Sequence, residues 1–141
     1  MKKLLYYLGM DLFSSFSPYA DSALLFLRLV LGGILLAHGL PKVRNIKGTS
    51  QWFESAGFKP GIFWAPLVAT VESVGALALI AGFGVQCVAA VLTIQFIVIN
   101  VWRIFRHEPL VGGFELDLII LASLLVLMTM GSGAFSLGLG F

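Results

Sequence analysis

Four long apolar segments constrain the fold of this chain more than any other feature of its sequence. They cover about residues 22–40, 62–83, 85–102 and 114–130. A helix needs roughly 20 mostly apolar residues to cross the hydrocarbon core of a bilayer, and each segment is close to that length. The sequence therefore predicts an all-α integral membrane protein, with its four helices packed as a bundle.

Composition excludes the other broad classes of protein. Hydrophobic residues make up 59% of the chain and charged residues only 11%, against roughly 25% charged in soluble domains. A soluble domain of 141 residues could not bury so much apolar surface, because small domains bury the smallest share of theirs. The net charge of +2 is too small and too scattered for a nucleic-acid partner. The single cysteine, Cys87, excludes an internal disulfide and a Cys-x-x-Cys redox pair.

Two parts of the chain do not read as spanning helices. Residues 1–21 mix aromatic and charged side chains, and we expect a short interfacial segment there rather than a cleaved signal peptide. The four-helix domain then covers residues 22–137. The loop of residues 41–61 places Trp52 and Phe53 among charged neighbours, and both a short helix in the headgroup region and a water-exposed loop fit this pattern.

An even number of spans places both termini on one side of the membrane. The loops after the first and third spans hold six basic residues, whereas the terminal side holds Lys2 and Lys3. The six are Lys42, Arg44, Lys47, Lys59, Arg103 and Arg106. Short loops rich in Lys and Arg stay in the cytoplasm. We therefore expect a multi-pass protein with both termini on the non-cytoplasmic side.

Several polar side chains lie inside the predicted spans, where charge is costly and usually faces the bundle interior. At a helical rise of about 1.5 Å per residue, Arg28 and Glu72 fall at nearly one depth near the middle of the membrane. We therefore expect them to form a buried polar pair with Gln95 nearby. Such a pair could fix the register of the helices or take part in function.

A second polar group is expected nearer the basic loops. His38, Asn100 and Glu115 each lie within about one turn of the loop-side end of their spans, and Lys42 and Trp52 follow close by in the sequence. A few convergent polar groups against aromatic and apolar walls are typical of a small-molecule site. These five residues are the predicted ligand-binding residues, although His38 could equally cap helix ends.

Three further patterns carry weaker predictions. Asp117 lies about 200° around its helix from Glu115, so we expect it to point away from the interior. No pair of His or carboxylate residues has the i, i+4 spacing of helical metal sites, and no metal is expected. Small residues such as Gly32, Gly33 and Gly39 either let helices approach closely or reflect the abundance of Gly in membrane spans.

Short motifs in the right order resemble the DoxX family over most of the chain. They are LRLVLG at 27–32, AHGLPK at 37–42, WFESAGF at 52–58, VESVG at 71–75, GGFE at 112–115 and the glycine-rich tail at 131–137. The resemblance implies a small four-helix protein of the inner membrane of bacteria or archaea. Polar positions that recur in the family correspond here to Arg28, His38, Lys42, Glu72 and Glu115. Ser73 departs from the pattern, because an apolar residue is commoner there.

The family is linked to quinol oxidation, thiosulfate:quinone oxidoreduction and quinone or catechol detoxification. The resemblance therefore implies a quinone-like or other amphipathic ligand, bound within or beside a membrane redox system, with His38 and Glu115 contacting its head group. The sequence shows no electron carrier, so catalysis would need a redox partner protein or a bound cofactor. The alternatives are a non-enzymatic scaffold or assembly subunit of an oxidoreductase complex and, less favoured, a small permease that would need a homo-oligomer.

Overall fold

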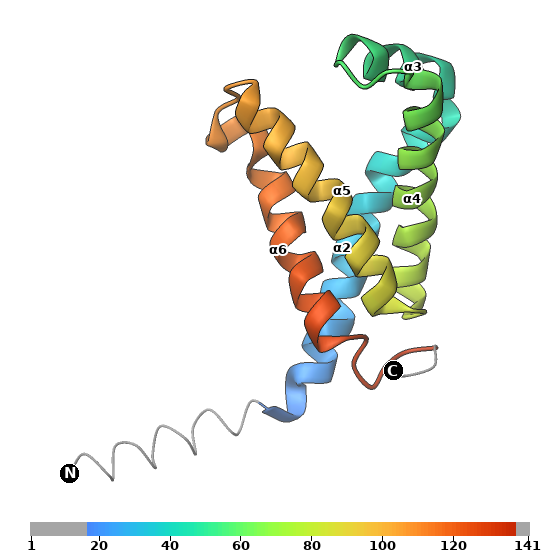
Figure 1. Cartoon of the computed structure of the whole chain (residues 1–141). Helices are drawn as coiled ribbons and strands as arrows, with labels where there is room; N and C mark the ends of the chain where they lie inside the picture. The colour runs from blue at the N-terminus through green and yellow to red at the C-terminus, as the bar shows by residue number, and fades with distance from the viewer. Residues whose placement is uncertain (1–16, 138–141) are drawn as a thin grey trace, which may run out of the picture.

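A computed structural model describes residues 17–137, and this part of the chain is helical with no β-strand. Its elements are η1 (Ser17–Tyr19), α2 (Ala20–Arg44), α3 (Ile46–Ser55), α4 (Gly61–Ala81), α5 (Val85–Phe105), η2 (Leu110–Phe114) and α6 (Glu115–Met130). Four helical segments are long and apolar enough to cross a membrane, namely η1 with α2, α4, α5, and η2 with α6, the last of which is kinked at Val111 and Gly112. The predicted all-α membrane bundle is confirmed (Figure 1).

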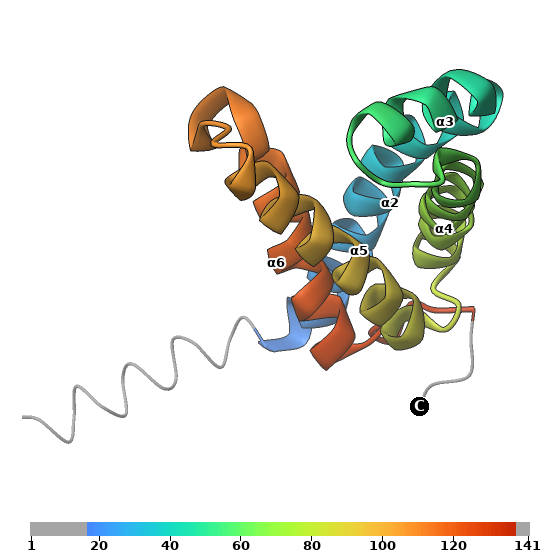
Figure 2. The ribbon, with the colours of Figure 1, turned by 45° about the horizontal axis from the view of Figure 1, so that its top comes forward.

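The helices form two arms that meet at one end of the molecule and separate at the other (Figure 1, Figure 2). The first arm is α2 packed along α4, with α3 against α4, and the second arm is α5 packed along α6. Fully buried leucines join the arms, among them Leu79, Leu92 and Leu124. In α4, α5 and α6 these leucines lie in the half of the helix nearer the α4–α5 turn. The apolar core is therefore at that end, and the arms separate where polar residues replace it.

Glycine ends α4 and allows the chain to turn directly into α5. Gly82 and Gly84 both have positive φ, at 74° and 54°, a conformation that costs glycine no Cβ clash. The amides of Gly82 and Phe83 bond back to the carbonyls of Leu79 and Ala78, which satisfies the last turn of the helix. This turn makes α4 and α5 antiparallel neighbours.

Two expectations about the first loop meet different outcomes. The predicted end of the first span at Leu40 is too early, because α2 continues through Pro41 to Arg44. The Asn45 amide bonds to the Pro41 carbonyl at 3.0 Å, and Lys42 and Arg44 suit the negative end of the helix dipole. For residues 41–61 the sequence fitted either a short helix or a water-exposed loop. The structure contains a short helix there, α3. The Asn45 side chain caps α3 by accepting from the Gly48 amide at 3.1 Å.

The predicted interfacial segment falls mostly outside the described residues. Of residues 1–21, the structure describes the short turn η1 and the start of α2. At the opposite end of the chain, the segment after α6 returns to this region, because the Ala134 amide donates to the Asp21 carboxylate at 3.0 Å. Both ends of the described chain therefore lie at the core end of the bundle, away from α3.

Glycines set the close approach of α2 to α4. A Cβ added at Gly32 would lie 2.9 Å from the Ala76 carbonyl oxygen, and one at Gly39 would lie 3.1 Å from the Ser73 amide nitrogen. A Cβ at Gly33 would meet nothing within 4 Å. Close packing thus explains Gly32 and Gly39, whereas Gly33 fits the view that glycine is simply common in membrane spans.

This difference predicts the stability of two neighbouring alanine variants. Gly32→Ala should lower the free energy of unfolding by about 1–3 kcal/mol, because the added methyl group must push backbone apart. Gly33→Ala should be neutral or stabilising by up to about 1 kcal/mol, because alanine favours the helix and has room. Melting temperatures in one detergent compare the two. Equal losses in both variants would show that α2 and α4 do not approach as described.

Candidate functional site

The carboxylate of Glu72 connects three helices at the base of the space between the arms. Glu72 lies on α4 and is 1% exposed. The Lys42 ammonium on α2 donates to both of its oxygens, at 2.6 and 2.5 Å. The Gln95 amide on α5 donates to Oε1 at 2.7 Å. We call Lys42, Glu72 and Gln95 the polar node. It ties the first arm to the second through one buried charge.

Local structure in α2 explains why Lys42 reaches Glu72. Because α2 continues past Pro41, Lys42 lies on the helix, one turn beyond Gly39. Gly39 packs against α4 at this level, where its Cβ would lie 3.2 Å from the Glu72 Cβ. The long lysine side chain can then run back along the helix to the carboxylate. A lysine expected outside the membrane therefore supplies the cation for a glutamate expected deep inside it.

The predicted pair between Arg28 and Glu72 is wrong. Arg28 is buried as expected, at 1% exposed, but its Nη2 donates to the Phe135 carbonyl in the segment after α6. Arg28 also lies against Gly82, where an added Cβ would clash with its guanidinium. Gly82 is ten residues beyond Glu72 on α4, or about 15 Å along the helix axis. The expected pairing assumed that α2 ends at Leu40, which left Lys42 outside the helix and Arg28 as the cation for Glu72.

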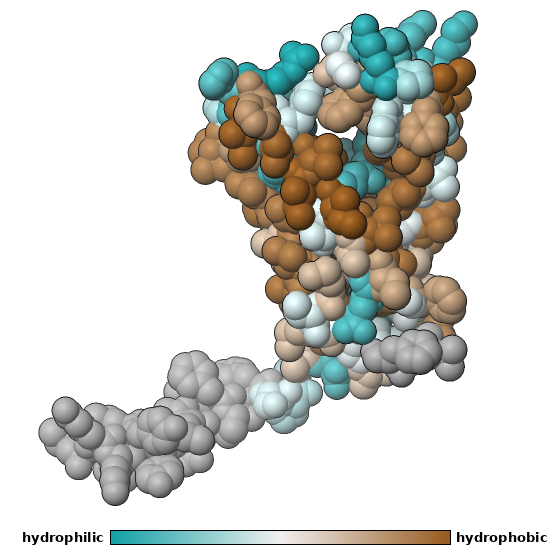
Figure 3. Space-filling view, in the orientation of Figure 1, coloured by the Kyte–Doolittle hydropathy of each residue, from teal (hydrophilic) through white to brown (hydrophobic). Residues whose placement is uncertain are grey.

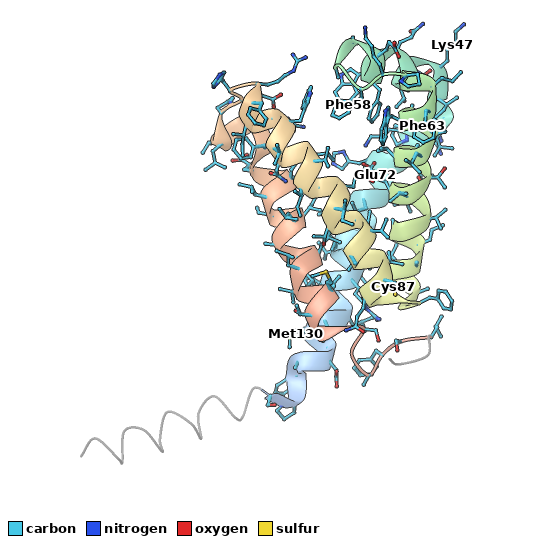
Figure 4. All side chains as sticks on the ribbon, in the orientation of Figure 1. Lys47, Phe58, Phe63, Glu72, Cys87 and Met130 are labelled. Atoms are coloured by element: carbon cyan, nitrogen blue, oxygen red, sulfur yellow. The ribbon has the colours of Figure 1, made fainter. Side chains whose placement is uncertain are left out.

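The surface is hollowed above the polar node, between the two arms (Figure 3). Glu72 faces this cleft from α4, below Phe58 of the α3–α4 loop (Figure 4). The Lys42 side chain is 30% exposed, against 2% for Glu72, and Gln95 is half-buried. Glu72 is therefore shielded from solvent, whereas its two partners in the node remain partly accessible.

Aromatic residues from both arms meet above the cleft. The Trp102 indole on α5 donates to the Ala56 carbonyl at 3.1 Å. Its ring lies 5.9 Å from that of Trp52 on α3 and 6.1 Å from that of Phe58. These spacings are typical of edge-to-face and tilted aromatic contacts. We call Trp52, Phe58 and Trp102, with the Ala56 carbonyl, the aromatic bridge.

A second ion-pair group stands on the second arm. Arg103 at the end of α5 pairs with Glu108 at 2.6 Å and with Asp117 of α6 at 2.7 Å. The Asp117 contact is an ion pair rather than an aligned hydrogen bond, because the Arg103 Nε lacks hydrogen-bond geometry. The expectation that Asp117 points away is wrong: its side chain is 16% exposed, whereas Glu115 is the exposed carboxylate. The two do face opposite directions, but the inward one is Asp117.

The five predicted ligand-binding residues occupy different surroundings. Lys42 is in the polar node, and Trp52, 53% exposed, is in the aromatic bridge. His38 is exposed. Asn100 is buried, with its amide donating to the Phe96 carbonyl at 2.7 Å. Among the described residues, Glu115 has no ion pair and no side-chain hydrogen bond.

Some buried side-chain oxygens inside the bundle accept no hydrogen bond from the described residues. Three buried oxygens have no partner among the described residues, namely Ser73 Oγ, Thr93 Oγ1 and Asn100 Oδ1. Buried polar atoms in proteins nearly always bond to protein or to water, so these oxygens can serve water or a bound molecule. In the described part of the chain, no three His, Cys, Asp or Glu side chains gather as metal ligands.

Sequence reasoning missed Trp102, Phe58 and the Arg103–Asp117 pair. One signal was present: Trp102 and Arg106 are spaced i, i+4 on one helix, and the Arg106 guanidinium does lie over the Trp102 ring at 4.8 Å. The contact of Trp102 with the α3–α4 loop had no local signal, because it joins segments 46 residues apart.

The polar node predicts strong coupling between Lys42 and Glu72. Lys42→Met leaves the buried carboxylate without its cation, and we expect a loss of about 3 kcal/mol, since Lys42 is partly exposed and the full range is roughly 3–5. Adding Glu72→Gln removes the unpaired charge and should restore most of that stability. Melting temperatures of both single variants and the double variant give the coupling.

Arg28→Met combined with Glu72→Gln is the matched control. These residues lie far apart, so their effects should add to within about 0.5 kcal/mol. Additive losses for Lys42 and Glu72, together with coupled losses for Arg28 and Glu72, would contradict the described polar node.

Comparison with known proteins agrees with these helices and with the motifs in the sequence. The chain matches the DoxX family over residues 23–103, more than half of its length and including the whole polar node. It is 29% identical over 108 residues to "Putative oxidoreductase CatD" of Bacillus subtilis (strain 168), covering 77% of this chain and 78% of that protein. No solved structure matches it. The chain belongs to the DoxX family.

Proposed function

We propose that this protein binds a quinone-like or other amphipathic small molecule in the cleft between its arms, within or beside a redox system of the inner membrane. The observation that carries the proposal is the polar node: a carboxylate, an ammonium and an amide held together at the base of a cleft in a membrane bundle. Small-molecule sites typically combine a few such fixed polar groups with apolar and aromatic walls.

The groups in the cleft suit both redox states of a quinone-like head. The Lys42 ammonium is a donor for a quinone carbonyl, and the Glu72 carboxylate is an acceptor for a quinol hydroxyl. Interactions of this kind are stronger away from water. His38 and Asn100 would add polar contacts on the walls, Trp52 an aromatic surface, and Glu115 a carboxylate at the outer rim. These roles would account for polar side chains at positions where apolar side chains would cost less free energy in a membrane.

Electron transfer would require a further component. The side chains of the cleft can bind and orient a head group and hold protons, but they do not carry electrons, which is the work of a cofactor or partner. The relative named as an oxidoreductase favours a role in such a system. We therefore propose a redox partner protein in the same membrane.

The scaffold hypothesis rests on a specific observation as well. Lys42 with Glu72, and Arg103 with Asp117, neutralise each other inside the chain, so both pairs could hold helices without any ligand. Mass spectrometry of material purified in mild detergent separates the two functions. A bound quinone favours ligand binding, and a stoichiometric protein partner without a small molecule favours a scaffold or assembly subunit.

Ligand binding can be tested by comparing two lysines that differ in position. Lys42→Gln should weaken binding of a short-chain ubiquinone analogue at least tenfold, because it removes the donor at the base of the cleft. Lys47→Gln makes the same charge change at an exposed position and should bind like the wild type. Quenching of tryptophan fluorescence in nanodiscs measures both affinities.

Binding should also weaken in His38→Ala and in Trp52→Leu, which alter the wall and the aromatic bridge. Equal affinities for the Lys42→Gln and Lys47→Gln variants would remove the polar node from the site. No binding by the wild type to any quinone analogue would favour the scaffold hypothesis.

We also propose that both termini lie outside the cytoplasm. Lys42, Lys47, Lys59 and Arg103 are among the cations at the α3 end of the bundle, whereas both ends of the described chain lie at the core end. The side with more Lys and Arg in short loops stays cytoplasmic. A C-terminal reporter that is active only in the cytoplasm should therefore give no signal, and a strong signal would reverse the orientation.

A further inference from the structure

We propose that ligands reach the polar node sideways, from the bilayer, because the aromatic bridge closes the aqueous end of the cleft. This inference rests on the proposed function and narrows the ligand class to uncharged, lipid-dissolved molecules with a long apolar part. Three observations carry it: the contacts of the aromatic bridge, the side opening of the cleft, and the ion pairs formed by Lys42 and Arg103.

The aromatic bridge joins the two arms at the end where they otherwise separate. The Trp102 indole bonds to the Ala56 carbonyl and contacts the rings of Trp52 and Phe58. Phe53, only 8% exposed, anchors both of these rings, with centroids 5.2 and 5.7 Å away. The Trp102 ring is hydrogen-bonded at its edge, in edge and tilted contact with two other rings and covered by Arg106, so it has little freedom to move. The bridge therefore forms a roof over the node on the side of the basic loops.

The cleft below this roof opens on the side of the bundle. Figure 3 looks across the helices rather than down them, and the hollow between the arms opens toward the viewer, which in a membrane is the lipid. On α5, Val91, Ile94 and Val98 are about half exposed and lie within roughly 100° of Gln95 around the helix. An apolar tail lying along this strip would place its head group at the polar node.

The charges around the cleft select the head group. Lys42 is paired with Glu72, and Arg103 with both Glu108 and Asp117. Within residues 17–137, these two cations thus face three carboxylates, and neither of the two is left for an anionic ligand. Removing a charged head from water to this depth would add a large desolvation cost. A neutral head with hydrogen-bonding oxygens avoids it and can use the donors of the node.

Thiol labelling measures these two access routes without any ligand, in nanodiscs and in a Cys87→Ser background. Gln95→Cys places one thiol in the cleft. A cationic methanethiosulfonate probes it from water, and N-phenylmaleimide probes it from the lipid. We expect the cationic reagent to label Gln95→Cys at least tenfold faster once Trp102→Ala removes the roof. The maleimide rate should change less than twofold, because its route does not pass the aromatic bridge.

Two controls keep the test decisive. Lys47→Cys, at an exposed position, should react with the cationic reagent equally with and without Trp102→Ala. Ile99→Cys, one turn from Gln95 on the same face of α5, replaces it if the loss of the Glu72 contact prevents folding. If the cationic reagent labels the cleft equally fast with and without Trp102, the cleft is open to water and the inference is wrong. That result would leave quinone binding itself standing, because no ligand takes part.

Discussion

A buried carboxylate in a membrane helix is the constraint on which the rest of this structure depends. Glu72 could not remain charged at this depth without a partner, and Lys42 and Gln95 supply one from each of the two arms. Pairing this buried charge determines several other features of the structure. Helix α2 must continue past Pro41 to carry Lys42, and Gly39 must lack a side chain so that α4 can approach. The sequence Pro41–Lys42, which is typical of a helix end, thus supplies the cation of the ion pair.

The two ends of the bundle are held together by different kinds of contact. At the core end, buried leucines join the arms, and Arg28 holds the segment after α6 through the Phe135 carbonyl. At the other end, few apolar residues connect the arms, and ion pairs and the aromatic bridge take their place. Apolar packing is rigid and dry, whereas the hydrogen bonds of the polar node can be exchanged for hydrogen bonds with a ligand. The two ends of the molecule therefore differ in how their helices are held together, and the proposed site lies at the end that lacks an apolar core.

Sequence predicted the helices well and their register poorly, for one physical reason. Membrane helices follow from hydrophobic length alone, so all four could be found without knowing their neighbours. Register depends on side chains in contact. With α2 ended at Leu40, Lys42 fell outside the helix, and Arg28 was left as the cation on α2 for Glu72. The same limit applies to Asp117. Helical geometry showed that Asp117 and Glu115 face different ways, but only the position of Arg103 on α5 decides which faces inward.

The paired charges alone do not distinguish a ligand site from a scaffold, because both benefit from neutral pairs. The difference lies in what remains unpaired and exposed. A purely structural node is most stable when it is sealed, since buried polar atoms without partners are destabilising. Here the Lys42 side chain stays partly exposed, and Ser73, Thr93 and Asn100 keep buried oxygens without partners in the described chain. Residual hydrogen-bonding capacity inside a membrane protein has a cost that binding can offset. This cost favours a site that is completed by a small molecule.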